Sequence, residues 1–465
     1  MSQRFDAIVI GAGISGETCA HRLSHAGMRV ALIERDRIGG ETAYWASIPS
    51  APLFGPANPR WRAQQAAGTA SPAVGWPHSL LSREAVLRYV QEAAQIDALA
   101  REGGAFISAE ARLAGPGRVD VGAQQLEAAH IVIATGSAPR IPAIPGLAAV
   151  DFWTNREATL SDAVPPTVII LGGEAQAIEL GQMFRLSGAD VTLITQHTGL
   201  VRHEDPDIGQ LLVQHLQQHG IRVLLGRAIV RAVRADDEGC ALTLDDGSLA
   251  RGRQVVVASG RIPRTDGLGL ERVGAHLGPH GVVVDECCRA AAGVWAVGDV
   301  TGVVPLSHVA QYQARVAADA ILGRAHPADY VAVPRVYFTD PQLAATGLTR
   351  AQIRQQGLNA LSVTMDLAEQ RERRGHSPAA HQPPGERLTL HADRTRGILV
   401  GAWAVAPEAG EWIQFAALAI RAAIPLAVAR DMLEQFPAFG DVYLSAIDRL
   451  IGDMTMTLSG ASSTT

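Results

Sequence analysis

The sequence predicts an α/β protein made of two Rossmann-like units, followed by a C-terminal α+β unit. Residues 5–34 contain an apolar run, a glycine turn, a helical segment and a second apolar run, in the order of a βαβ unit. The same order begins again at Pro165, and such a repeat is expected of a protein with two dinucleotide sites. From Pro334 onward no glycine fingerprint follows the apolar runs, which indicates a third unit.

The first glycine turn has the spacing typical of dinucleotide-binding turns. Gly11 permits the tight turn, Gly13 lets the backbone approach a pyrophosphate, and Gly16 lets the helix pack closely on the strand. Glu34 ends the second apolar run, about 20 residues further on, where a carboxylate can bond a ribose diol. Strand, turn, helix and acid together favour an adenine dinucleotide site over an ordinary βα turn.

The second glycine turn, at residues 172–177, has lost several of these groups. Glu174 stands where the backbone would approach the pyrophosphate, and its bulk and negative charge both oppose a dianion. Ala177 replaces the third glycine, and the next strand ends on Thr195-Gln196 without an acid or an adjacent arginine for the ribose. Two interpretations remain open, a structural relic and a working nicotinamide site, so NAD(P)H is a doubtful cofactor.

Two further buried strands end in small-residue turns. One breaks into Ala134-Thr135-Gly136, and the other ends at Gly298-Asp299. A carboxylate at the carboxyl end of a sheet strand can bond a polyol hydroxyl. The alternative for Asp299 is a helix cap for the segment that follows Pro305.

Composition excludes several classes of function. The net charge of −6 and the lack of basic runs argue against nucleic acid as a partner. No apolar stretch is long enough for a membrane span, so we expect a cytoplasmic protein without a membrane partner. The basic side chains are all arginines, which excludes Schiff-base lysine chemistry. The cysteines show neither C-x-x-C spacing nor a disulfide framework, and the histidines show no metal-ligand spacing, so no metal is expected.

In their order and spacing, these motifs resemble the FAD-dependent pyridine nucleotide-disulfide oxidoreductases, the family of dihydrolipoamide dehydrogenase, glutathione reductase and mercuric reductase. Residues 333–341 resemble the opening of that family's C-terminal dimerisation domain. The resemblance implies a homodimer whose active sites borrow residues from the partner. The implied domains are a discontinuous FAD-binding domain (1–146 and 263–329), an NAD(P)-binding-like domain (147–262) and a dimerisation domain (330–465).

The resemblance also implies which residues bind FAD. Most belong to the glycine turn and to the strand ends described above. The implied residues are Gly11, Gly13, Gly16, Glu34, Arg35, Gly40, Thr42, Ala134, Thr135, Gly136, Gly298, Asp299 and His308.

The sequence departs from the family pattern at the redox centre. The family places two cysteines after the pair of glycines at 39–40, and here those positions are Thr42 and Ser47. Hydroxyls cannot cycle between dithiol and disulfide, so exchange through this pair is excluded. The family's lysine is replaced by Ala51, which leaves its usual partner beside the flavin, Glu179, unpaired.

The family's C-terminal acid/base pair is also altered. Its His-Pro…Glu pattern aligns with Phe436-Pro437 and Asp441, and phenylalanine cannot shuttle a proton. The losses at the redox centre, the nicotinamide turn and this pair are mutually consistent. We therefore predict retained flavin chemistry with a changed electron path.

The leading hypothesis is an FAD-dependent oxidoreductase that oxidises a small organic metabolite directly at the flavin, with dioxygen or another acceptor. Tyr44, with Trp45, would form an aromatic wall for the substrate, or would simply pack beneath the FAD. Asp441 and Tyr443 of the partner chain are candidate proton handlers, although Asp441 fits equally well a surface or cap position. Ser47 is a candidate hydrogen-bond donor, with a helix N-cap as the favoured alternative.

Two other functions remain open. One is an NAD(P)H-dependent reductase of quinones or similar acceptors, which requires the second glycine turn to bind nicotinamide. The other is a flavoprotein that catalyses a non-redox step or acts only as a binding protein. The sequence does not identify the substrate or the electron acceptor.

Overall fold

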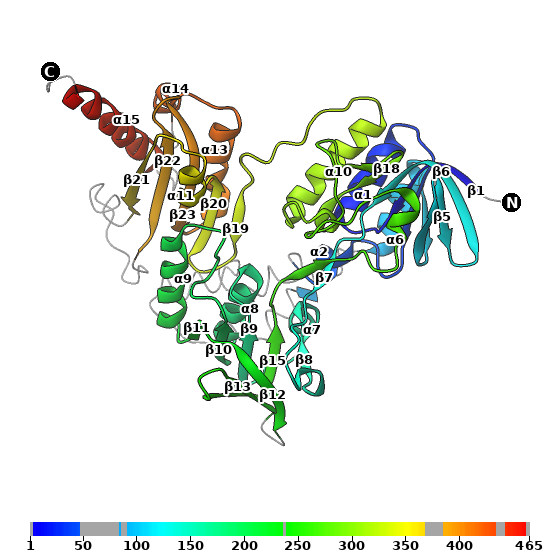
Figure 1. The fold of residues 1–465 in the computed structure, drawn as a ribbon, viewed down its shortest axis with the longest axis horizontal. Helices are drawn as coiled ribbons and strands as arrows, with labels where there is room; N and C mark the ends of the chain where they lie inside the picture. Colours follow the sequence, from blue (N-terminus) through cyan, green and yellow to red (C-terminus); the bar gives the residue numbers. More distant parts are fainter. Residues whose placement is uncertain are drawn as a thin grey trace.

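The computed structural model describes residues 3–46, 83–84, 91–235, 239–367, 385–433 and 442–461. These residues form three units, each built on its own large sheet, and in Figure 1 the second unit joins the other two from below. This confirms the predicted fold class, two Rossmann-like units with a C-terminal α+β unit.

The first unit is built on an eight-stranded sheet with β1 near its centre. β1 pairs in parallel with β2 on one side and β6 on the other. Residues Ala7–Val9 are fully buried although their side chains alternate between the two faces, so both faces of the sheet are covered here. Its elements before the second unit are β1 (Gln3–Ile10), α1 (Ile14–His25), β2 (Val30–Glu34), α2 (Gly40–Tyr44), α6 (Glu92–Arg101), β3 (Ala105–Ser108), β4 (Ala111–Gly115), β5 (Arg118–Val121), β6 (Gln124–Ile133) and β7 (Ser137–Pro139).

The chain returns to this first sheet after the second unit. β18 pairs in parallel with β6, which brings the Gly298-Asp299 turn to the same sheet edge as the first glycine turn. The returning elements are η3 (Leu270–Val273), β17 (Arg289–Ala291), β18 (Val294–Ala296), η4 (Gly298–Thr301) and α10 (Ser307–Ile321).

The second unit repeats the Rossmann pattern on a five-stranded parallel sheet with the order β11-β10-β9-β15-β8. A smaller antiparallel sheet, β12-β13-β14, packs beside it, and β16 pairs with β7 to form a two-stranded ribbon back to the first unit. The elements are η2 (Leu147–Ala149), β8 (Phe152–Trp153), α7 (Asn155–Leu160), β9 (Thr167–Leu171), α8 (Ala175–Leu186), β10 (Asp190–Thr195), α9 (Pro206–Gln218), β11 (Arg222–Leu225), β12 (Ile229–Ala235), β13 (Gly239–Leu244), β14 (Leu249–Gly252), β15 (Gln254–Val257) and β16 (Arg261–Pro263).

The third unit is a five-stranded antiparallel sheet with the order β19-β20-β23-β22-β21. Alternate residues of its central strands face opposite sides. Leu343, Trp403 and Val405 join the core of the second unit, whereas Ala344 and Ala404 face the unit's own helices. Its elements are β19 (Arg335–Tyr337), β20 (Gln342–Gly347), α11 (Arg350–Gln355), β21 (Ala360–Asp366), β22 (Arg387–Asp393), β23 (Ile398–Ala406), α13 (Ala409–Arg421), α14 (Leu426–Arg430) and α15 (Val442–Ala461).

Two adjacent carboxylates of the second unit are buried against the third unit. Glu204 accepts hydrogen bonds from Arg335 Nε at 2.6 Å and Nη2 at 2.9 Å, and from the Tyr337 hydroxyl at 3.1 Å. Asp205 lies 3.1 Å from His391 Nε2 and accepts the backbone N–H of Arg350 at 2.8 Å. These contacts fix the second unit to the third.

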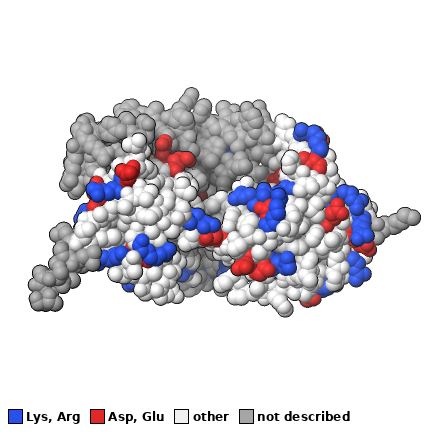
Figure 2. Space-filling model, turned by 90° about the horizontal axis from the view of Figure 1, so that it is seen from above, with Lys and Arg blue, Asp and Glu red and all other residues white. Residues whose placement is uncertain are grey.

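The distribution of charge and the apolarity of the helices bear on possible partners. On the face shown in Figure 2, basic and acidic side chains are interspersed. Within the described ranges, no helix combines the length and apolarity needed to cross a membrane.

Replacing Arg335 with methionine tests the anchor at Glu204. The side chain of Glu204 is 1% exposed, so the substitution leaves a buried carboxylate without its cation. We expect Arg335→Met to lower the free energy of unfolding by about 3 kcal/mol, measured by urea denaturation. The matched control is Arg430→Met, which breaks the exposed Arg430–Asp448 pair and should cost less than about 1 kcal/mol. Equal losses for the two variants would contradict this account.

Candidate functional site

The first glycine turn has the geometry of a dinucleotide cradle. Gly11 has a φ of +102°, and a Cβ atom added there would lie 2.3 Å from the Ala134 carbonyl oxygen. A Cβ atom added at Gly16 would lie 1.8 Å from the Gly11 carbonyl oxygen, so the helix contacts the strand too closely for any side chain. At Gly13 no atom of the described residues lies within 4 Å of an added Cβ, which leaves the backbone open to a ligand. The residues present therefore fit a bound pyrophosphate.

Glu34 is held in position beside this turn. Its Oε2 accepts the Ala12 N–H at 2.7 Å, and its Oε1 accepts the Asp36 N–H at 2.8 Å. The carboxylate borders a cavity of about 250 Å³ that Arg35 and Thr135 also line. Glu34, Arg35 and Thr135 thus lie together at one cavity, where an adenosine would fit.

The start of α2 lies directly on the glycine turn. Gly39 donates its N–H to the Ala12 carbonyl at 2.7 Å, and a Cβ added at Gly40 would lie 2.8 Å from the Gly13 Cα. Thr42 is the third residue of α2, and its Oγ1 is 3.2 Å from the Ser307 Oγ at the start of α10. Thr42 is the residue that the family resemblance aligns with the first cysteine.

The remaining strand-end residues gather at the same sheet edge. Asp299 accepts a hydrogen bond from the Ser137 hydroxyl at 2.6 Å, and α10 has Leu306 rather than Asp299 as its N-cap. Gly136 and Gly298 both have positive φ angles, +68° and +80°. His308 is the second residue of α10 and its side chain is exposed. The structure thus brings Gly136, Gly298 and Asp299 together at one sheet edge.

The aromatic pair on α2 is buried under arginines. Tyr44 is 3% exposed and Trp45 is 9% exposed. The Arg37 guanidinium lies 3.8 Å from the centre of the Tyr44 ring, and that of Arg156 lies 3.8 Å from the Trp45 ring. This arrangement supports the packing interpretation rather than an open aromatic wall.

The proposed proton handlers are differently placed. Tyr443 is 1% exposed, packs against Trp412 and Phe415 in the core of the third unit, and donates its hydroxyl to the Trp412 carbonyl at 3.4 Å. This placement explains Tyr443 as a packing residue and does not support proton transfer by it. Ser47 and Asp441 lie outside the described residues, so their roles stay predictions.

The second glycine turn keeps its backbone shape. Gly172 has a φ of +148°, and a Cβ added there would lie 2.2 Å from the Ala258 carbonyl oxygen. Glu174 is the N-cap residue of α8, and its Oε1 lies 3.5 Å from Arg202 Nε. The negative charge that opposes a nucleotide is therefore partly neutralised by an arginine that sequence analysis did not single out.

Glu179 lies one turn further along α8. Sequence analysis expected it to be unpaired, but its Oε1 accepts the Phe338 N–H at 2.9 Å across the contact with the third unit. Burial raises its pKa to about 7, although this hydrogen bond acts in the opposite direction. Glu179 is therefore an acid whose protonation state changes near neutral pH.

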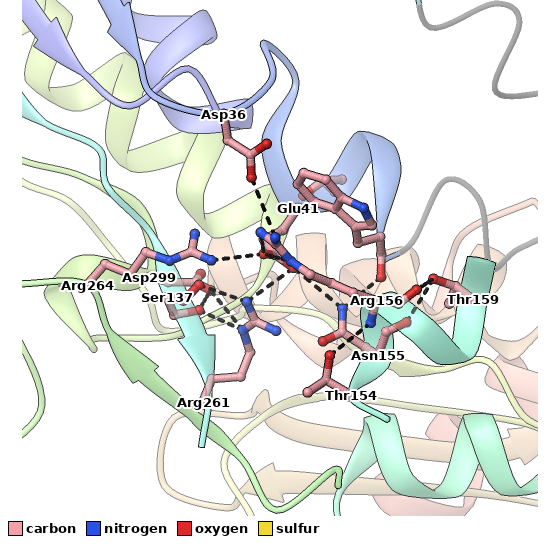
Figure 3. Close-up of polar contacts among 12 residues, drawn as sticks. Asp36, Glu41, Ser137, Thr154, Asn155, Arg156, Thr159, Arg261, Arg264 and Asp299 are labelled. Atoms are coloured by element: carbon pink, nitrogen blue, oxygen red, sulfur yellow. Dashed lines mark hydrogen bonds and ion pairs between the residues drawn. The ribbon is translucent and has the colours of Figure 1, made fainter. Parts of the chain in front are cut away.

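The structure also assembles an ionic cluster that sequence analysis missed, shown in Figure 3. Three arginines surround Glu41 on α2. Arg156 reaches Glu41 Oε1 with Nε at 2.9 Å and also with Nη2, Arg264 Nη2 is 3.0 Å from Oε1, and Arg261 Nη2 is 3.6 Å from Oε2. Each of the three arginines is more than a hundred positions from Glu41 in the chain, so no local sequence pattern predicts the cluster.

Comparison with known proteins places the chain in a family. The family model described as pyridine nucleotide-disulphide oxidoreductase matches residues 5–314, and the model of that family's dimerisation domain matches residues 333–446. The chain belongs to this family, which supports FAD as its cofactor.

The relatives cover almost the whole chain. A mercuric reductase from Streptomyces lividans is 33% identical over 442 residues, covering 90% of each chain. A dihydrolipoyl dehydrogenase from Haloferax volcanii is 28% identical over 474 residues, covering 98% of each.

Solved structures share the fold. LpdA from Mycobacterium tuberculosis superposes with a TM-score of 0.84 at 25% identity, covering 96% of this chain and 99% of its own. The HOCl-induced flavoprotein disulfide reductase RclA from Escherichia coli gives a TM-score of 0.84 at 24% identity, covering 95% and 99%. At this identity the likeness to RclA shows the fold alone.

Glu179 makes the stability of the folded chain depend on pH. Its folded pKa of about 7 lies above the ordinary value of 4.5, so between these values the folded state binds more protons than the unfolded state. We expect the contribution of Glu179 to stability to be fully present below pH 4.5 and to decline as pH rises toward 7. Glu179→Gln should flatten this decline in urea-denaturation series between pH 5 and 8. The exposed Glu271→Gln serves as control and should keep the wild-type slope, and an unchanged slope in Glu179→Gln would contradict the assignment.

Proposed function

We propose that this protein is an FAD-dependent oxidoreductase that exchanges electrons directly with a small organic metabolite, without a thiol–disulfide relay. The observation that carries the proposal is the Thr42–Ser307 hydroxyl contact, together with the family resemblance that aligns Thr42 with the first cysteine. The four cysteines of the chain stand elsewhere, and the structure has each as a free thiol, at Cys19, Cys240, Cys287 and Cys288. Burial raises the pKa of Cys19 and Cys288 to about 12, which makes both poor nucleophiles at neutral pH.

Bound FAD would supply the hydride acceptor, and dioxygen or another acceptor would take the electrons onward. The chain would then supply proton transfer to or from the metabolite. Asp441 of the partner subunit remains a candidate for this role on the family resemblance. Glu179 is a second candidate, because the resemblance puts it beside the flavin and its pKa lies near neutral pH. We also propose that the protein acts as a homodimer, on the strength of its dimerisation domain.

A second candidate is an NAD(P)H-dependent reductase of quinones or similar acceptors. It is favoured by the preserved backbone of the second glycine turn and by the Arg202–Glu174 ion pair, which reduces the charge that opposes a nucleotide. The names of two relatives, mercuric reductase and dihydrolipoyl dehydrogenase, are also those of oxidoreductases.

Anaerobic flavin bleaching separates the two candidates. For the leading proposal we expect neither NADH nor NADPH to bleach the visible flavin band within minutes, whereas dithionite bleaches it and air restores it. Rapid bleaching by either nucleotide would overturn the leading proposal and support the reductase. If neither nucleotide bleaches the flavin, a survey of small organic metabolites for anaerobic bleaching would identify the class that acts as electron donor.

Substitution of Glu174 tests why the nucleotide turn would be inactive. Glu174→Gly removes both the side chain and its charge from the N-terminus of α8, so we expect nucleotide affinity to rise at least about tenfold, which corresponds to about 1.4 kcal/mol. Arg202→Gln is the complementary variant and should weaken binding, because it leaves Glu174 without its cation. Calorimetric titration with NADPH measures both. An unchanged affinity in Glu174→Gly would show that other losses inactivate the turn.

A further inference from the structure

We propose that Arg264 binds the FAD pyrophosphate, and that Glu41, together with Arg156 and Arg261, positions the Arg264 side chain. FAD binding would then stabilise the contact between the second unit and the first. The inference starts from the position of Glu41. It is the second residue of α2, and α2 begins where Gly40 packs on Gly13 of the glycine turn. A pyrophosphate at Gly13 would therefore approach a helix start that carries a carboxylate.

The charge of Glu41 has to be compensated for a dianion to bind there. Its side chain is only 16% exposed, so water screens it poorly. Burial would raise its pKa, but hydrogen bonds from Arg156 and Arg264 and the positive charge of Arg261 hold the pKa below its ordinary value. Glu41 is thus ionised, and three guanidinium groups surround its single negative charge.

The guanidiniums differ in their other partners. Arg156 also approaches Asp36 at 3.5 Å, and Arg261 approaches Asp299 at 3.9 Å while donating to the Ser137 hydroxyl at 2.7 Å. Among the described residues, Glu41 is the one carboxylate recorded within ion-pair distance of Arg264. A guanidinium has five N–H donors, so Arg264 retains donors for a phosphate.

Arg264 also lies at the right place. It lines the same cavity of about 250 Å³ as Gly11 and Glu34, and its backbone is fixed there by two hydrogen bonds. Its N–H donates to the Gly136 carbonyl at 2.9 Å, and its carbonyl accepts the Thr135 hydroxyl at 2.7 Å. Planar, permanently charged guanidinium groups suit phosphate oxygens well.

The cluster joins two units of the fold. Glu41 belongs to the first unit, whereas Arg156 and Asn155 begin helix α7 of the second. Asn155 donates its side-chain N–H to the Trp45 carbonyl at 2.7 Å, and Arg156 covers the Trp45 ring, so α7 grips the end of α2. In Figure 3, Arg156 approaches Glu41 from one side, while Arg261 and Arg264 approach it from the other. A ligand that binds Arg264 therefore affects the Glu41 carboxylate, which Arg156 of α7 also contacts.

The test measures FAD affinity rather than turnover. Apoprotein variants are titrated with FAD, and quenching of flavin fluorescence gives the dissociation constant at low and high salt. Arg264→Gln should weaken binding at least about tenfold and reduce its salt dependence, since one charge-assisted phosphate contact is lost. Arg264→Lys keeps the charge without the planar fork and should lose less. The control Arg222→Gln, on an exposed β11 position, should bind FAD as the wild type does.

The coupling between units has its own readout. In the wild type, FAD should slow amide hydrogen exchange in residues 155–160. In Arg156→Gln this protection should disappear while FAD affinity falls by less than about tenfold, because Arg156 acts through Glu41. Wild-type affinity for FAD in both folded Arg264 variants would overturn the binding role. If Arg264→Gln does not fold, wild-type affinity in Arg264→Lys alone would overturn it. An amide hydrogen exchange rate in residues 155–160 of the wild type that is the same with and without FAD would overturn the coupling.

Discussion

The contact between α1 and the end of β1 is the constraint on which the first unit depends. With 1.8 Å between an added Gly16 Cβ and the Gly11 carbonyl oxygen, no residue but glycine permits this approach. The contact aims the helix N-terminus at the sheet edge and leaves the backbone at Gly13 open. This contact also sets the positions of other parts of the site. Glu34 ends β2, which pairs with β1, and the Gly298-Asp299 turn follows β18, which reaches β1 through β6. The start of α2 packs directly on the glycine turn at Gly13.

This dependence explains what the sequence could predict. Glycine spacing and apolar runs are local signals, so both Rossmann units were predictable, as were Gly11, Glu34, Arg35 and Thr135 at the cavity. Arg264 lines the same cavity and was not predicted. The Glu41 cluster was not, because an ion pair between residues far apart in the chain leaves no periodic trace. Burial was equally hidden: the sequence cannot tell a tyrosine that faces a substrate from one that packs under an arginine, as Tyr44 does. The hydrogen bond between Glu179 and Phe338 depends on two units meeting, which no single segment encodes.

The departures from the family pattern have a common physical sense. A thiol relay needs nucleophilic sulfur, and Thr42 offers a hydroxyl bonded to Ser307 instead. At the second glycine turn, the Glu174 carboxylate forms an ion pair with Arg202. At both places polar groups of the chain contact one another. The cofactor cradle differs, since no atom of the described residues lies near an added Cβ at Gly13.

The anchor at Glu204 and Asp205 has a mechanical consequence. These neighbouring residues are tied to different strands of the third unit, Glu204 to β19 and Asp205 to β22, while apolar side chains of β20 and β23 enter the core of the second unit. Attachment of neighbouring residues to two different strands resists rotation of the second unit against the third better than a single attachment would. On its other side, the β7–β16 ribbon and the ion pairs of Glu41 connect the second unit to the first, so a load on the third unit is carried to the first partly through these contacts.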